Sequence, residues 1–318
     1  ELNRHLTAEL PPLPTSAPID SVTAGIVRGA FETICYEVAT HLGRAASSAI
    51  INQSNERNAS IMDGHGRLAG LSVGIPQLLF ISPMSVRYGL DFRERDDWGP
   101  GDVFVGNDPD AGGGHLPDYN VYAPVFDDEG EVVAIQALQA HQGDTGGKDP
   151  GGFSVDAMEI FAEGLIIPCV KLVHRGEPRR DILELIMRNN RLPSFPGDIA
   201  AMISATQLGV RLMGELITRY GADVVRAAIN FNVSETERRF REAVAGWPDG
   251  NYEADVWIDH DTVGNEDIRV HVNCIVEGDQ LTVDMTGSDD RPELVCVWNT
   301  FSNTRGYAMA QLASMVDP

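Results

Sequence analysis

The chain reads Asn107-Asp108-Pro109, then Gly112-Gly113-Gly114-His115-Leu116-Pro117-Asp118 and later His141-Gln142-Gly143-Asp144, three polar motifs around one apolar hairpin. The hairpin covers 119–126 and 131–140 and turns at 127–130. With Asp128 at the centre of the turn, His115 and His141 are predicted to lie directly opposite each other. Facing residues of an antiparallel pair have Cβ atoms roughly 4.5–5.5 Å apart, which suits two ligands of one metal ion.

Each histidine begins a His-x-x-Asp unit, so Asp118 and Asp144 add carboxylate oxygens to the two imidazole nitrogens. Divalent Zn, Mn or Fe accepts this mixture of donors. One such unit in a Gly-rich loop is more often simple turn chemistry. Two units placed on either side of one hairpin favour a metal site, and we predict one here.

Glycine clusters at 112–114 and 143–152 lie beside the two histidines. Such clusters usually mark tight turns, but a backbone without side chains also lets a substrate approach closely. Because of their position, we predict that Gly113, Gly114, Gly146 and Gly147 form a substrate loop.

The composition is that of an ordinary globular chain of 318 residues, with 43% hydrophobic and 22% charged residues. The net charge of −23 argues against binding to nucleic acid or to anionic membranes, both of which attract basic proteins. Four widely spaced cysteines indicate reduced thiols in a cytosolic protein: Cys35, Cys169, Cys274 and Cys296. With no visible signal peptide and no apolar run of about 18 residues, we expect a soluble, cytoplasmic protein.

The pattern of apolar residues predicts an α+β protein with a mixed or antiparallel β core that carries the metal hairpin. We expect three units: a metal-bearing core (1–178), a helical segment (179–247) and a β meander with a helix (248–318). Expected elements of the core are a helix from Asp20 or Ser21 to about Ala49, a hairpin of 58–63 and 67–71, strands at 102–106 and 165–172, and a short helix at 156–163. Pro76 and Pro83 are expected to interrupt regular structure between the two hairpins.

The other two units have clear periodicity. Apolar residues three and four apart predict helices at 180–190, 197–220 and 222–246, with Gly221 as the C′ glycine between the last two. Alternation over 250–286 predicts three strands, and a final helix is expected at 304–315.

Other catalytic motifs are weak. Gly146-Gly147-Lys148 lacks the spacing of a phosphate-binding loop, and no Gly-x-Gly-x-x-Gly follows a strand. The segment 70–74 has the Gly-x-Ser-x-Gly form of a nucleophile elbow. That elbow must open a helix, which Pro76 and Pro83 oppose.

The chain resembles the hydantoinase B/oxoprolinase family over nearly its whole length. The similar stretches are 101–109, 112–118, Ala140-His141-Gln142-Gly143-Asp144, 159–168 and Asp284-Met285-Thr286-Gly287-Ser288. The family includes B-type subunits of ATP-dependent hydantoinases, oxoprolinases and lactamases, and related subunits of acetone and acetophenone carboxylases. Since the family continues for about another third beyond the last residue given, we expect a fragment or a split subunit.

The resemblance implies a division of labour. An A-type partner subunit binds ATP with Mg²⁺ and phosphorylates the substrate oxygen, while the B-type chain holds a divalent metal that orients water or that oxygen. By position, the metal ligands fall on His115, Asp118 and His141. Asp144 and Lys148 are expected to line the site as base or anion partner.

Two departures bear on the reaction. Many hydantoinase relatives carry an Asp in a Glu-Arg-x-Asp-Phe-Ser stretch, where this chain reads Glu56-Arg57-Asn58-Ala59-Ser60. They also commonly carry His-His-x-Asp, where this chain has Gln142 in second place. We therefore expect an ATP-dependent ketone carboxylase that uses bicarbonate. The alternatives are hydrolysis of a cyclic amide by a hydantoinase, 5-oxoprolinase or lactamase, and a non-catalytic assembly subunit.

Overall fold

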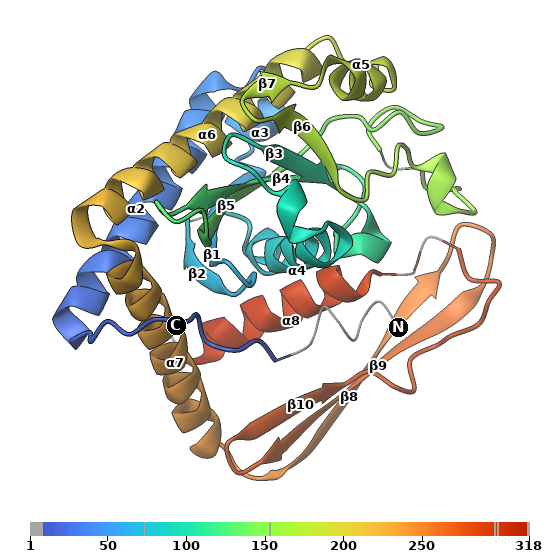
Figure 1. The fold of residues 1–318 in the computed structure, drawn as a ribbon. Coiled ribbons are helices and arrows are strands. Elements are labelled where there is room, and N and C mark those ends of the chain that lie inside the picture. The colour runs from blue at the N-terminus through green and yellow to red at the C-terminus, as the bar shows by residue number, and fades with distance from the viewer. Residues whose placement is uncertain (1–8, 73, 153, 296, 298, 317–318) are drawn as a thin grey trace.

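The computed structural model describes residues 9–316 apart from 73, 153, 296 and 298. It is an α+β fold, as predicted, built around a seven-stranded antiparallel sheet in the order β2-β1-β5-β4-β3-β6-β7 (Figure 1). The strands are β1 (Arg57–Asp63), β2 (Leu68–Leu71), β3 (Val103–Gly106), β4 (Asp118–Phe126), β5 (Val132–His141), β6 (Val170–His174) and β7 (Glu177–Pro178).

Helices cover both faces of this sheet, which is why its central strands are buried along almost their whole length. One face packs against α2 (Ser21–Ala45) and α6 (Phe195–Tyr220), and the other against α4 (Pro76–Phe92). Odd-numbered β4 residues such as Tyr119 belong to the first core, where the Tyr119 ring meets Phe195 edge-on at 6.0 Å. Tyr122 and other even-numbered residues face α4.

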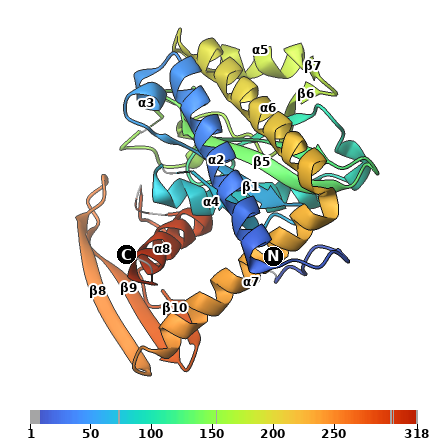
Figure 2. The same cartoon turned by 90° about the vertical axis from the view of Figure 1, so that its left-hand side faces the viewer.

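The remaining helices are α3 (Ala49–Asn52), α5 (Arg180–Arg188), α7 (Ala222–Ala245) and α8 (Phe301–Val316). A second sheet, in the order β10-β9-β8, joins β8 (Gly250–His260), β9 (Glu266–Glu277) and β10 (Gln280–Asp284). It stands beside α7 and α8, away from the first sheet, and β8 is exposed along nearly its whole length (Figure 2). The last helix, α8, returns to pack on α4 (Figure 1).

The predicted helices at 180–190, 197–220 and 222–246 and the three predicted strands of 250–286 are confirmed. The first helix, expected to reach Ala49, ends at Ala45. The carboxylate of Asp198 on α6 accepts hydrogen bonds from the backbone N–H groups of Ser47 and Ser48 and thereby holds them outside a helix.

Three predictions within the core are wrong. A 17-residue helix, α4, occupies the segment expected to be irregular: Pro76 occupies its first turn, where a missing N–H costs nothing, and Pro83 is accommodated inside it. The helix expected at 156–163 is a single 3₁₀ turn, Ile160–Ala162. The strand expected at 165–172 begins only at Val170, because Asn107 and Thr145 take the backbone hydrogen bonds of Leu165 and Ile167.

Cys35, Cys169 and Cys274 are free thiols, and Cys296 lies outside the described residues. Among the helices that the structure describes, none has the length and apolar character needed to span a bilayer.

Helix α2 is anchored to the sheet chiefly by side chains such as Phe31, which is fully buried. We predict that Phe31→Ala lowers the free energy of unfolding by about 3–5 kcal/mol, because it removes apolar contacts and leaves a cavity. Tyr36→Ala is the matched control on the same helix, since Tyr36 is 64% exposed, and it should change stability by less than about 1 kcal/mol. Urea titration of both variants measures the difference, and equal losses would contradict the packing described.

Candidate metal centre

The central hairpin brings Asp118, not His115, opposite His141. The predicted register is therefore wrong. Phe126 pairs with Val132, so the turn is centred one residue later than expected, and a bulge next to Phe126 shifts the pairing once more. As a result the first residue of β4 faces the last residue of β5.

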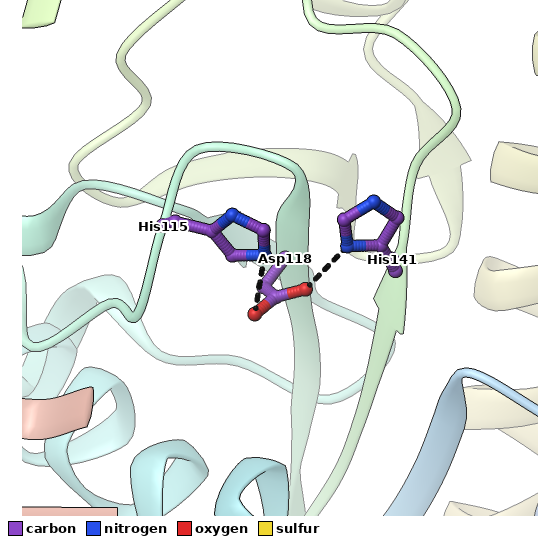
Figure 3. A group of neighbouring side chains, drawn as sticks. All are labelled: His115, Asp118 and His141. Carbon is purple, nitrogen blue, oxygen red and sulfur yellow. Dashed lines mark hydrogen bonds and ion pairs between the residues drawn. The ribbon is translucent and has the colours of Figure 1, made fainter. Parts of the chain in front are cut away.

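His115 reaches the same place from the turn that precedes β4. The backbone N–H of Asp118 donates to the carbonyl of His115 at 3.0 Å and closes this turn. The His115 imidazole is thereby folded back over the strand end, with Nε2 3.1 Å from Oδ2 of Asp118. On the other side, Nδ1 of His141 lies 3.1 Å from Oδ1 of the same carboxylate (Figure 3).

Buried Asn107 fixes the loop that carries His115. Its side-chain NH₂ donates to the carbonyls of Leu116 and Leu165, and its side-chain oxygen accepts from the N–H of Ile167. One fully buried amide thus joins the end of β3, the histidine turn and the 165–167 segment. These bonds explain the asparagine of the Asn-Asp-Pro motif.

The three side chains fit a divalent cation. One possible ligand atom from each of His115, Asp118 and His141 lies within 4.8 Å of the others, and no other group of three or more His, Cys, Asp or Glu side chains does so among the described residues. Two imidazole nitrogens and one carboxylate oxygen match the preferences of Zn, Mn or Fe. The predicted ligands are therefore brought together, although not in the predicted register.

Electrostatics prepare the carboxylate for this role. Burial opposes ionisation of Asp118, but hydrogen bonds from His115 and His141 outweigh it, so the pKa of Asp118 lies below its usual value. Burial also opposes charge on His115, yet the hydrogen bond to Asp118 leaves the pKa of this imidazole above its usual value. The site thus holds an ionised carboxylate between two basic nitrogens.

The three side chains form one wall of a pocket of about 590 Å³. Two further carboxylates line it, Glu56 and Glu163, and Oε2 of Glu56 lies 3.8 Å from Nδ1 of His141. Sequence reasoning did not single out either. Glu56 directly precedes β1, the neighbour of β5, and Glu163 lies in the 159–168 stretch that carries part of the family resemblance. Desolvation raises the pKa of Glu163, although His115 partly offsets this.

The rest of the lining comes from distant parts of the chain. Ile75 and Leu78 stand at the start of α4, and Gly152, Ser154 and Val155 belong to the loop after β5. The last part of the chain contributes Thr262, Asn299, Asn303 and Tyr307. Because α8 packs on α4, it brings Asn303 and Tyr307 to the pocket that the start of α4 also lines.

Next to Asp118 and His141, the candidate metal ligands on the two strands, the same face of the sheet continues with carboxamides. Asn58, Gln139 and Asn120 are paired across three adjacent strands, and all three are buried. Asn58 belongs to the stretch whose departure from the hydantoinase pattern suggested a carboxylase. It lies beneath the pocket and does not line it. Gln142 points elsewhere and donates to the Ala140 carbonyl and to Sδ of Met202.

Asp144 and Lys148 are not brought to the pocket. The Asp144 carboxylate is fully buried, where it accepts from the backbone N–H and the guanidinium of Arg191. The ammonium of Lys148 is paired with Asp149 and Asp156. We therefore expect Asp144 to hold Arg191 in position and not to act as a base or anion partner.

The predicted substrate-loop glycines stand where an added side chain would meet neighbouring parts of the chain. A Cβ added to Gly113 would meet the Asn107 carbonyl at 2.5 Å, and one added to Gly147 would meet Glu163 at 2.4 Å. A Cβ added to Gly146, whose φ is +80°, would collide with the Asn189 carbonyl, and one added to Gly114 would meet the side chains of Ile81 and Asp118. None of the four lines the pocket, so their role is close packing of the loops that carry the ligands.

Ser72 of the Gly-x-Ser-x-Gly segment is not a nucleophile in this structure. The objection that no helix follows is wrong, because α4 begins at Pro76. Ser72 is nevertheless buried, and its hydroxyl accepts a hydrogen bond from the backbone N–H of Ala59.

The proposed ligand role of His115 is tested by metal titration. We predict that His115→Ala weakens binding of Zn²⁺ or Mn²⁺ roughly 100-fold or more, because one of three protein donors is removed. His41→Ala is the control, since this half-buried imidazole hydrogen-bonds to Ser204 and does not line the pocket of the candidate ligands. Calorimetry on the metal-stripped protein measures both affinities, and unchanged binding by the His115 variant would reject this ligand set.

Asp144→Asn separates positioning from ligation. It weakens the charge-assisted contacts to Arg191, so we expect a loss of about 1–3 kcal/mol in the free energy of unfolding. Affinity for the metal should stay within about twofold, because Asp144 is not among the converging donors. Urea titration and calorimetry give the two readouts, and a large loss of metal affinity with unchanged stability would restore Asp144 as a ligand.

Known proteins resemble this chain in sequence and in fold. Caprolactamase subunit beta of Pseudomonas jessenii is 32% identical over 268 residues, which are 83% of this chain and 45% of that protein. The crystal structure of the ATP-dependent caprolactamase from this organism superposes with a TM-score of 0.84 at 30% identity, over 91% of this chain and 50% of that chain. An acetone carboxylase structure, at 18% identity, shares the fold with a TM-score of 0.79, over 94% of this chain and 41% of that one.

The chain spans about half the length of the bacterial subunits it matches. A family model described as Hydantoinase B/oxoprolinase matches residues 20–318, which include all three converging side chains. The resemblance read from the sequence motifs is thereby confirmed, and the chain belongs to the hydantoinase B/oxoprolinase family.

Proposed function

We propose that this chain is the metal-bearing part of an ATP-dependent enzyme that hydrolyses a cyclic amide. The observation that most directly supports this proposal is that His115, Asp118 and His141 converge on one side of the pocket. A cation bound there would polarise a carbonyl or phosphoryl oxygen as a Lewis acid. Because the sequence lacks a phosphate-binding loop, we assign ATP binding to an A-type partner subunit.

Phosphorylation of the amide oxygen by the partner makes that oxygen a good leaving group. Attack of water on the same carbon gives a tetrahedral intermediate, in which the C–N bond breaks, the ring nitrogen leaves with a proton and the ring opens to an acyl phosphate. A second water then attacks the acyl carbon and expels phosphate, which leaves a carboxylate. These steps need a group that accepts a proton from water. Glu163 is our candidate, because its carboxylate lines the pocket and desolvation raises its pKa towards the range of an effective base.

Hydrolysis is favoured here over carboxylation for a physical reason. Asn58 and Gln142, the two residues that suggested a ketone carboxylase, do not line the pocket. The relative with about 30% identity in sequence and structure is a caprolactamase, and this supports amide chemistry. Carboxylation of a ketone with bicarbonate remains the second candidate because the His-Gln form of the motif departs from the common hydantoinase pattern.

The reaction is tested with the purified complex, ATP and the metal. We predict that lactams and hydantoins stimulate ADP formation and are opened, and that Glu163→Gln lowers kcat about 100-fold or more while metal binding is retained. Incorporation of ¹⁴C from bicarbonate into a ketone, without ring opening of any amide, would select the carboxylase. ATP-independent ring opening would reject the scheme.

A further inference from the structure

The pocket beside the metal ligands is acidic. Its lining includes the carboxylates of Glu56, Asp118 and Glu163, and none of its described lining residues is Lys or Arg. Nearby cations are already engaged: Lys148 pairs with Asp149 and Asp156, and Arg191 with Asp144. A negative group on a substrate would therefore find no cationic side chain of this lining to pair with.

A bound divalent cation does not reverse this balance. Two charges on the cation against three carboxylates leave a formal charge of −1 when both histidines are neutral ligands. The cation also attracts the oxygen or phosphoryl group at the reacting carbon, since those are the hard donors next to it. The part of the substrate away from the reacting carbon thus meets Glu56 and Glu163 without a compensating positive charge.

The remaining lining is apolar or neutral. Ile75, Leu78, Val155 and Tyr307 offer hydrocarbon or aromatic surface, and Asn299 and Asn303 offer carboxamides. Val155 and Tyr307 are 69% and 53% exposed, so apolar surface at the pocket would be removed from water when a substrate binds. Such walls favour an alkyl chain or an unsubstituted ring.

We propose that the substrate of this site is uncharged outside its reacting carbonyl, such as a lactam with an alkyl ring, and that a ring bearing a carboxylate, such as 5-oxoproline, is rejected. This inference rests on the proposed function, because it takes the pocket as the place where the carbonyl compound binds. Rejection arises from repulsion between like charges that the pocket would hold close together.

A matched pair of ligands tests the proposal by binding alone. 5-Oxoproline and its amide, 5-oxoprolinamide, have nearly the same shape and differ by one charge. We expect the Zn²⁺-loaded chain to bind the amide at least about tenfold more tightly in calorimetry or ligand-observed NMR at neutral pH. Equal or tighter binding of 5-oxoproline would overturn the proposal, and so would the failure of both ligands to bind at tens of millimolar.

A pair of variants locates the effect in the pocket. Val155→Arg places a cation on the lining, and Val155→Gln is the control of similar length without charge. The ratio of affinities for 5-oxoproline and its amide should shift towards the carboxylate by about tenfold in the Arg variant relative to the Gln variant. The same ratio in both variants would show that the lining does not select by charge.

Turnover distinguishes failure of this inference from failure of the proposed function. With ATP and the partner subunit, 2-pyrrolidinone should be opened with a kcat/KM at least about tenfold above that of 5-oxoproline. A preference for 5-oxoproline would overturn the inference and leave the cyclic amide hydrolase standing. If no carbonyl compound is turned over, the proposed function fails, and the binding ratio still decides whether the pocket rejects a carboxylate.

Discussion

The pairing of Asp118 with His141 across the central hairpin is the contact on which the site depends. Both strands are covered by helices on two faces, so their register cannot slip without moving every buried side chain to the opposite face. A buried carboxylate is costly unless it is paired, and Asp118 is paired on both sides by imidazoles. Packing of the core therefore also fixes the geometry of the candidate ligands.

Local patterns predicted the elements well where one periodicity extended over many residues. The helices of 180–246 and the strands of 250–286 follow directly from apolar spacing. The hairpin was also recognisable, but its register was not. The turn is centred one residue later than expected, and the bulge next to Phe126 is invisible in the alternation of a strand that is buried on both faces. Proline was misleading for α4, since Pro76 occupies its first turn and Pro83 is tolerated within it.

The site was predictable only in the part that is local in sequence. His115, Asp118 and His141 belong to one hairpin and its preceding turn, so spacing alone brought them together. Glu56 and Glu163 enter through strand order and through the loop held by Thr145, neither of which spacing reveals. Asp144 has the right chemistry and neighbours in sequence, yet its carboxylate turns away to Arg191.

The residues that line the pocket also differ in how firmly the core holds them. The candidate ligands Asp118 and His141 stand at strand ends that the core holds in register, and His115 lies in the turn before β4. Another part of the lining comes from α8 and the loop around Val155. Tyr307 and Val155 are exposed enough to be changed with little cost to the core. Such exposed residues can be replaced while the core keeps the candidate ligands in place. Selectivity for the uncharged part of a substrate can therefore change without moving those ligands. The charge selection that we propose thus rests on the carboxylates of the lining, Asp118 among them, while the exposed apolar residues can change.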